Sequence, residues 1–240
     1  MLTQMCSVAG GGSHVVRIRN ALTPLCLSHR ESSVHWCFPP KWKGLLAWRP
    51  GLRVVSGSTE VLPLSSLSLV KLQFFIDQAG DPEPVRCPVE CLAALSEGGA
   101  DIQTSAELEV WYLSAGLHGA IGYSGLANYL RHCESYQLLG FLFEEGSSSE
   151  KLQHLAERYG VSISHFRRLC HQALGNAAKP ELRSWRAAKA LLKMSEGKCS
   201  LTDVALEFGF ASSSHFSKEV RELVGVAPSS LIDITRLSSE

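Results

Sequence analysis

Hydrophobic and polar positions change their period along the chain. Between residues 44 and 65 the short apolar pieces GLLAW, LRVVSG and EVLPL are separated by Pro and Gly, a pattern typical of short β-strands. From Ser66 onward the apolar positions recur at helical spacing, as Leu67, Val70, Leu72, Phe74 and Phe75. Residues 123–146 predict one or two buried helices, whereas DPEPVRCP (81–88) is expected to form a loop. We therefore expect three or four short strands followed by helices.

Residues 1–43 show no steady period. They are interrupted by AGGGS and FPPKW, so we expect this segment to be poorly ordered. Three or four strands are too few for a complete β-barrel, although a reduced barrel with an added helical layer stays open.

The last hundred residues contain an internal repeat. LQHLAERYG (152–160) aligns with LTDVALEFG (201–209) at an offset of 49, and after the glycine the offset becomes 50. Ser-His-Phe then recurs in both copies, and each second segment ends in Leu-Gly or Val-Gly. Each copy therefore predicts a helix, a glycine turn and a second helix, which is the helix-turn-helix arrangement.

Serines mark the predicted starts of these helices. Ser147 with Glu150, and Ser200 with Asp203, have the spacing of a capping box. Ser162 and Ser212 are predicted caps of the second helix in each copy, which leaves both helix N-termini free to meet phosphates.

The second helix of each copy has one apolar face and one polar face. The predicted buried faces are Ile163, Phe166, Leu169, Cys170 and Ala173 in the first copy, and Phe216, Val220, Leu223 and Val224 in the second. The opposite faces carry Ser164, Arg167, Arg168 and His171, and at the same offsets Ser214, Ser217, Lys218 and Arg221. A helix with a buried stripe and a basic, hydrogen-bonding stripe can lie in the DNA major groove.

The stretch KPELRSWRAAKALLKMSEG joins the two copies. Pro180 suits the first helical position, and Leu182, Trp185, Ala188 and Leu192 form the predicted buried stripe. A helix of about 15 residues would be about 22 Å long at 1.5 Å per residue. Such a spacer could place two recognition helices in successive major grooves, which are about 34 Å apart.

Charge supports this interpretation locally. The 240-residue chain has a formal net charge of 0, yet residues 150–194 carry nine basic residues against three acidic ones. Within this block Lys179, Arg183 and Arg186 could contact phosphate or simply face solvent. Residues 195–240 carry four basic and seven acidic residues, so we expect the first copy to dominate affinity and specificity. Residues 56–133 are acidic, with nine acidic and three basic residues, which suggests a place for partner contact or self-association.

Enzymatic and metal sites find little support. Cys26, His29, His35 and Cys37 match no standard zinc spacing, and Cys87-x3-Cys91 is similarly weak. His165 and Cys170 fall on different helix faces, and no Gly-rich phosphate loop is present. We therefore predict no catalytic residues, no metal and no cofactor. Eight scattered cysteines and the lack of an 18-residue apolar run favour a cytosolic protein over a disulfide scaffold or a membrane protein.

The second copy, TDVALEFGFASSSHFSKEVRELVGVAP, resembles the signature of the AraC/XylS family of bacterial transcription regulators, over about residues 135–238. Only the usual aromatic at Val220 is missing. CESYQLLGFLFEEG, LAERYGVSISHFRRLCHQALG and ELRSWRAAKALL are more narrowly similar to the InvF branch of invasion-gene activators, to which MxiE-type regulators are related.

The resemblance implies a mainly α fold. Residues 131–240 would form an all-α domain of two helix-turn-helix subdomains joined by a linker helix, preceded by a smaller α+β regulatory domain at 44–130. It also implies a cytoplasmic bacterial activator of type III secretion genes that binds double-stranded promoter DNA and RNA polymerase, needs a type III secretion chaperone as co-activator and forms a possible homodimer. By position, the DNA contacts fall on Ser164, Arg167, Arg168 and His171 in the first site, and on Ser213, Ser214, Ser217, Lys218 and Arg221 in the second.

Two alternatives stay open at this point. Many relatives carry an N-terminal barrel that binds a small effector, and some are fused to a cysteine- and zinc-dependent DNA-repair module. The second alternative is less favoured because the chain has no Pro-Cys-His-Arg acceptor.

Overall fold

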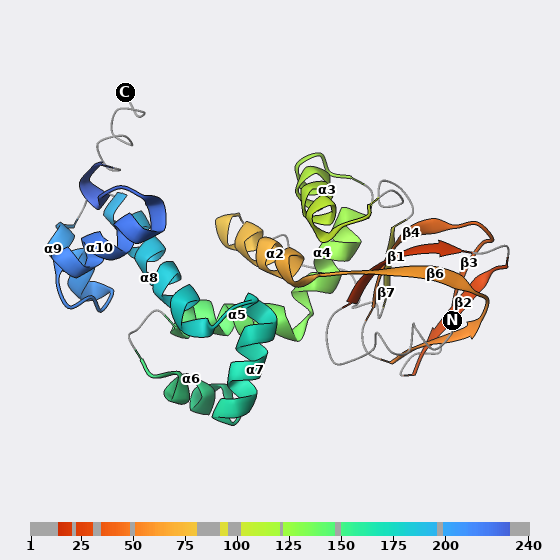
Figure 1. Ribbon diagram of the computed structural model, residues 1–240, viewed down its shortest axis with the longest axis horizontal. Coiled ribbons are helices and arrows are strands. Elements are labelled where there is room, and N and C mark those ends of the chain that lie inside the picture. Colours follow the sequence, from red (N-terminus) through yellow and green to blue (C-terminus); the bar gives the residue numbers. More distant parts are fainter. Residues whose placement is uncertain are drawn as a thin grey trace. The chain divides into compact units, whose positions relative to one another are not determined.

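The computed structural model divides into two compact units, residues 1–137 and residues 138–240 (Figure 1). The sequence placed this boundary at 130/131, seven residues earlier. The structure describes residues 14–20, 23–30, 35–48, 51–80, 92–95, 102–120, 122–146, 150–195 and 199–230. The predicted loop at 81–88 lies outside these residues, as do Cys87 and Cys91.

The N-terminal unit contains two antiparallel sheets. The first has the strand order β6-β1-β4-β7, formed by β1 (His14–Asn20), β4 (Lys43–Trp48), β6 (Thr59–Leu64) and β7 (Leu92–Leu95). The second has the order β3-β2-β5, formed by β2 (Leu25–His29), β3 (His35–Phe38) and β5 (Leu52–Ser56).

One apolar cluster joins the two sheets. It contains Ile18, Leu46 and Trp48 from the first sheet and Leu25, Leu27 and Phe38 from the second. Strand β4 lies between β1 and β7, and Gly44 through Trp48 are all buried, which explains why this strand reads as a continuous apolar run. Strand β2 instead alternates between buried and partly exposed positions, so only one of its faces meets the core.

The three strands predicted between residues 44 and 65 are confirmed as β4, β5 and β6. The prediction that residues 1–43 are poorly ordered is wrong for residues 14–20, 25–29 and 35–38, which form β1, β2 and β3. These strands are short, and β1 pairs with β4 and β6, which are distant in the sequence. Strand formation depends on such pairing more than on local propensity, so the local pattern was weak. Seven strands among the described residues also remove the strand-count argument against a barrel-like unit.

Helices α2 (Leu67–Ala79), α3 (Ser105–Leu117) and α4 (Tyr123–Arg131) also belong to the N-terminal unit, and α5 (Glu134–Glu145) crosses its boundary. Thr104 and Glu107 form a capping box at the start of α3. Helix α4 packs near the first sheet, where the Tyr129 hydroxyl donates to the carbonyl of Trp48.

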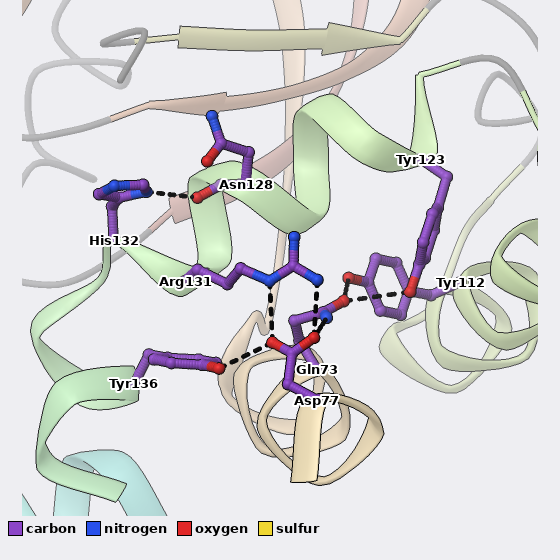
Figure 2. A network of polar contacts seen from close by, with 8 residues as sticks. All are labelled: Gln73, Asp77, Tyr112, Tyr123, Asn128, Arg131, His132 and Tyr136. Atoms are coloured by element: carbon purple, nitrogen blue, oxygen red, sulfur yellow. Dashed lines mark hydrogen bonds and ion pairs between the residues drawn. The ribbon is translucent and has the colours of Figure 1, made fainter. Parts of the chain in front are cut away.

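Helix α2 buries polar residues that its apolar pattern did not reveal. Gln73 and Asp77 are buried beside Leu69, Val70 and Phe74, whereas Phe75 is 37% exposed. Figure 2 shows that side chains from the neighbouring helices converge on this pair. Arg131 donates to both Asp77 carboxylate oxygens at 2.8 and 2.6 Å, and the Tyr136 hydroxyl donates to Asp77 Oδ2 at 2.7 Å. Tyr112 donates to Gln73 Oε1 at 2.5 Å.

This network keeps Asp77 ionised. Burial opposes ionisation, but the hydrogen bonds from Arg131, Tyr136 and Gln73 outweigh it, so the pKa of Asp77 lies below its usual value. The hydrogen bond to Asp77 raises the pKa of Arg131. A carboxylate buried at this depth is tolerated because its charge is paired and its oxygens accept several donors.

The C-terminal unit is all helical in its described residues. After the end of α5 it contains α6 (Leu152–Tyr159), α7 (Ile163–Leu174), α8 (Ala178–Ser195), α9 (Leu201–Glu207) and α10 (Ser213–Val224). The predicted helix, turn, helix order of both copies is confirmed. Helix α6 begins after Lys151, which is its N-cap and makes no side-chain cap hydrogen bond. The capping box predicted for Ser147 and Glu150 therefore does not start this helix. Ser147 itself lies outside the described residues.

Each helical pair has its own core. The rings of Phe141, Tyr159 and Phe166 pack together in the first, with Phe141 and Tyr159 centroids 4.9 Å apart. The second is built from Val204, Ala205, Phe210, Phe216 and Val220, together with Ala187, Ala190 and Met194 of α8. The linker helix is therefore part of the second core.

Candidate nucleic-acid interface

A glycine in the left-handed region forms the turn of each helical pair. Gly160 has φ of 81° and follows α6, and Gly209 has φ of 70° and follows α9. Residues with a Cβ rarely adopt this conformation, so both turns require the glycine that recurs in the repeat.

The repeated Ser-x-x-His pattern caps the second helix of each pair. The Ser162 side chain accepts a hydrogen bond from the backbone N–H of His165 at 3.3 Å, and Ser212 accepts from His215 N–H at 3.1 Å. Ser200 and Asp203 form the predicted capping box of α9. These three caps are confirmed, and they satisfy N–H groups that no helical carbonyl can reach.

Helix α7 presents all four residues predicted for the first site on its surface. Ser164, Arg167, Arg168 and His171 are exposed, while Phe166, Leu169, Cys170 and Ala173 on the other side are buried. Ile163, predicted to be buried, is partly exposed. Among the described residues, no carboxylate forms an ion pair with Arg167 or Arg168, so both guanidinium groups are available to an anionic partner.

The five residues predicted for the second site surround one surface concavity of about 580 Å³. It is lined by Ser213, Ser214, Ser217, Lys218 and Arg221 of α10, together with Leu201 and Glu222. Lys218 lies 3.9 Å from Glu222 Oε1, so this site is less positive than the exposed face of α7.

The buried face of α10 differs from the prediction. Phe216 and Val220 are fully buried as expected, but Leu223 is 40% and Val224 is 44% exposed. Their expected place is taken by Glu219, which is 5% exposed. The reason is a partner from another helix: Arg183 of α8 binds the Glu219 carboxylate through Nε and Nη2.

Glu219 thus connects the second recognition helix to the linker helix. His215 Nε2 lies 3.2 Å from Glu219 Oε1 and adds a second donor. Burial opposes ionisation, but Arg183 and His215 outweigh it and lower the pKa of Glu219. The sequence pattern does not single out Glu219, although its position three residues after Phe216 and just before Val220, on the apolar face of α10, is a signal.

The linker helix buries a different face from the one predicted. Ala187, Ala190 and Met194 are buried, whereas Leu182, Trp185 and Ala188 are partly exposed and Leu192 is 69% exposed. Small alanine side chains allow α8 to approach the second core closely, which explains why the larger residues lie outside. The helix begins two residues before Pro180 and spans 18 residues, or about 27 Å at 1.5 Å per residue.

Much of the basic block is engaged inside the unit. Arg186 lies over the Phe210 ring at 4.8 Å from its centroid, and Lys189 lies over the Phe143 ring at 3.6 Å. Arg158 pairs with Glu145 and Glu150 at 3.2 and 2.7 Å. Arg183 is exposed, as one of its two expectations has it, but its guanidinium is paired with Glu219. Arg186 is only partly exposed and stacks on Phe210, so the expectation of a phosphate- or solvent-facing side chain is wrong for Arg186. Lys179 is exposed and has no partner among the described residues.

Comparisons with known proteins agree with this geometry. A family model described as a helix-turn-helix domain matches residues 155–233, which include both turns. The invasion protein InvF of Salmonella typhimurium is 40% identical over 187 residues, covering 78% of this chain and 87% of that protein. The chain belongs to the InvF-like branch of the AraC family. Members of this branch are DNA-binding transcription regulators, and in this chain the two helical pairs form the helix-turn-helix domain.

This InvF-like chain has two further similarities to known proteins. The transcriptional regulator MxiE of Shigella flexneri is 37% identical over 110 residues, covering 45% of this chain and 52% of that protein. The crystal structure of ToxT from Vibrio cholerae aligns with a TM-score of 0.39 at 13% identity, covering 92% of this chain and 89% of that chain. Within the described part of the chain, no helix is both long and apolar enough to cross a bilayer.

Proposed function

We propose that this protein activates transcription of type III secretion genes in the bacterial cytoplasm by inserting α7 and α10 into successive major grooves of promoter DNA. The observation that carries the proposal is the pair of capped helices with exposed polar faces, joined by the single helix α8. A length of about 27 Å for α8 fits grooves that recur about every 34 Å, because each recognition helix adds width of its own. We assign the protein no enzymatic activity.

The residues proposed to read bases are Ser164, Arg167, Arg168 and His171 on α7, and Ser213, Ser214, Ser217, Lys218 and Arg221 on α10. An arginine that binds guanine O6 and N7 discriminates by about 1–3 kcal/mol, whereas serines select less strongly. Since Lys218 shares its charge with Glu222, the first site should supply most of the affinity and specificity. The second site would add backbone contacts or touch RNA polymerase.

A comparison of two variants tests this ranking. Arg167→Ala and Lys218→Ala are titrated against a cognate promoter fragment and a scrambled fragment, with Lys151→Ala as an exposed control outside both faces. Arg167→Ala should reduce the preference for the cognate fragment by about tenfold, which equals 1.4 kcal/mol. Lys218→Ala should weaken both fragments about equally. Equal losses on both fragments for both variants would overturn the ranking.

We also propose a type III secretion chaperone as co-activator, which rests on the likeness to the InvF branch. A reporter fused to the target promoter is measured with and without the co-expressed chaperone. Strong activation only with the chaperone supports the proposal. Activation without it, but dependent on a metabolite, would instead favour an N-terminal effector domain, an alternative that the seven strands of the described residues keep open.

A second copy of this chain is the proposed partner of α3. Val110, Leu113 and Leu117 are 69%, 40% and 84% exposed and, with exposed Ala106, follow the 4-3-4 spacing of a coiled-coil seam. Such a stripe is self-complementary, and it lies in the acidic region expected to serve partner contact or self-association. Leu117→Glu should shift the full chain from dimer to monomer in sedimentation velocity, and Ser114→Glu on the same helix should not. A monomeric parent chain would refute the proposal, and loss of chaperone binding instead would assign the stripe to the chaperone.

A further inference from the structure

Two cysteines of the N-terminal unit face each other across neighbouring strands. Cys26 of β2 lies directly opposite Cys37 of β3 in the antiparallel register, and their Sγ atoms are 2.6 Å apart. Both are free thiols. They belong to neither helical pair, so DNA binding does not account for them.

The strands hold this dithiol in place and leave it accessible. Leu25 and Leu27, on either side of Cys26, are fully buried in the core. Because successive strand residues point to opposite faces, Cys26 points away from that core. Cys37 is exposed and Cys26 is partly exposed, so a small reagent can reach the sulfur pair.

Each of the other described cysteines lacks solvent access or a second cysteine beside it. Cys133 and Cys170 are buried, and burial raises the pKa of Cys170 to about 11, so its thiol is inert at neutral pH. Cys199 is exposed but has no cysteine beside it among the described residues. Within the described part of the chain, Cys26 and Cys37 are therefore the only two thiols that lie side by side and are accessible to a reagent.

We propose that Cys26 and Cys37 form a reversible thiol-oxidation site that a small hydroperoxide converts to a cross-strand disulfide. One thiolate attacks the terminal peroxide oxygen, giving a sulfenic acid and releasing water or an alcohol. The second thiol then attacks that sulfur, and the sulfenic oxygen leaves as water. Overall, two thiols lose two electrons and two protons, the peroxide is reduced, and a dithiol reductant reverses the change.

The reaction should be faster in mild alkali. The interaction with Cys26, together with some desolvation, raises the pKa of the Cys37 thiol. A raised pKa leaves less thiolate at neutral pH, and the thiolate is the form that attacks. The oxidation rate should therefore rise as pH increases through the thiol range, which suits a site that stays reduced until the peroxide concentration is high.

Peptide mapping of the full-length protein tests the proposal. The reduced chain is treated with hydrogen peroxide, remaining thiols are blocked with N-ethylmaleimide, and the product is digested with trypsin without reduction. Cleavage after Arg19, Arg30 and Lys41 places Cys26 in peptide 20–30 and Cys37 in peptide 31–41. The expected result is one linked species of these two peptides, a loss of two free thiols per chain, and recovery of both peptides after dithiothreitol.

Variants keep the test specific. Cys26→Ser or Cys37→Ser should abolish the linked species, whereas Cys199→Ser should leave it unchanged. The proposal would be overturned if peptides 20–30 and 31–41 were recovered separately, each blocked by maleimide, under conditions that oxidise Cys199. It would also be overturned if the link formed equally fast in urea-unfolded protein. The mapping uses no DNA, so its outcome is independent of the proposed function.

Discussion

At the scale of single residues, the two serines near the start of α7 have different roles. Ser162 caps the helix through the His165 N–H, while Ser164 lies on the exposed face. Loss of a serine cap costs about 1 kcal/mol, and substitution of an exposed residue usually changes stability by less than about 0.5 kcal/mol. Ser162→Ala should therefore lower the free energy of unfolding in urea, and Ser164→Ala should lower DNA affinity instead. The reverse pattern would contradict both the cap and the proposed reading face.

Glu219 and Glu222 offer a second matched pair, since both bind Arg183. The Glu219 carboxylate is 4% exposed and that of Glu222 is 55% exposed, so only the first has lost its water. Glu219→Gln should destabilise the C-terminal unit by about 2–3 kcal/mol, because the buried carboxylate loses its charge and its charge-assisted hydrogen bonds from Arg183. Glu222→Gln should cost about 0–1 kcal/mol, as exposed pairs do. Equal effects in urea titrations would show that burial does not distinguish the two.

Glu219 and Glu222 also give the sign of the pH dependence of the unfolding free energy. The folded pKa of Glu219 is lowered, so its contribution is present above the pKa of the unfolded carboxyl, near 4.3, and is lost as pH falls toward the folded value. The unfolding free energy should thus decline on acidification below about pH 5. Glu219→Gln should make that decline shallower at low ionic strength, while Glu222→Gln should leave it nearly unchanged.

Residues such as Glu219 show what the sequence could not predict. The caps at Ser162 and Ser212 depend on neighbours three residues away, so their spacing was sufficient. The Arg183 and Glu219 pair joins residues 36 apart in sequence, and a count of charges cannot reveal which cation meets which carboxylate. The same holds for Asp77 and Arg131, which are 54 residues apart.

At the scale of elements, substituting a glycine in a turn and a glycine in a helix should change stability in opposite directions. An added Cβ at Gly160 would meet no atom within 4 Å, so the only cost of Gly160→Ala is its φ of 81°, about 1–2 kcal/mol. Gly160→Asn should cost less, because asparagine tolerates this region better. Gly125 lies inside α4 with open space around it, and Gly125→Ala should stabilise its unit by about 0.5–1 kcal/mol. Thermal unfolding of the three variants checks this order.

The elements also divide into those that the sequence specified and those that it did not. The helical pairs were predicted because their periodicity, caps and turns are local and occur twice. The strands β1 to β3 were missed because they are stabilised by the strands they pair with, and their own local sequence pattern is weak. The buried face of α8 was assigned to its large apolar residues, yet Ala187 and Ala190 face the second core, since close helix packing favours small side chains there.

At the scale of the whole molecule, the fold converts a neutral chain into a local cationic surface. The nine basic residues of the 150–194 block suggested one broad basic face. In the structure Arg158, Arg183, Arg186 and Lys189 meet carboxylates or aromatic rings of the same unit. The charge left for an external polyanion is thus concentrated at Arg167 and Arg168, with Lys179 as a further exposed cation.

The salt dependence of DNA binding tests this division of charge. Each phosphate contact steepens the dependence of log affinity on log salt concentration by about 0.9. Lys179 is exposed at the start of α8, so Lys179→Gln should make the slope shallower by about that amount. Arg183→Gln removes the same formal charge, but this guanidinium already binds Glu219, so the slope should stay unchanged while the unfolding free energy falls. Both variants are measured at a temperature where circular dichroism shows full helix content. Equal changes in slope would mean that Arg183 reaches the DNA in spite of its ion pair, and that the basic block acts as a single surface.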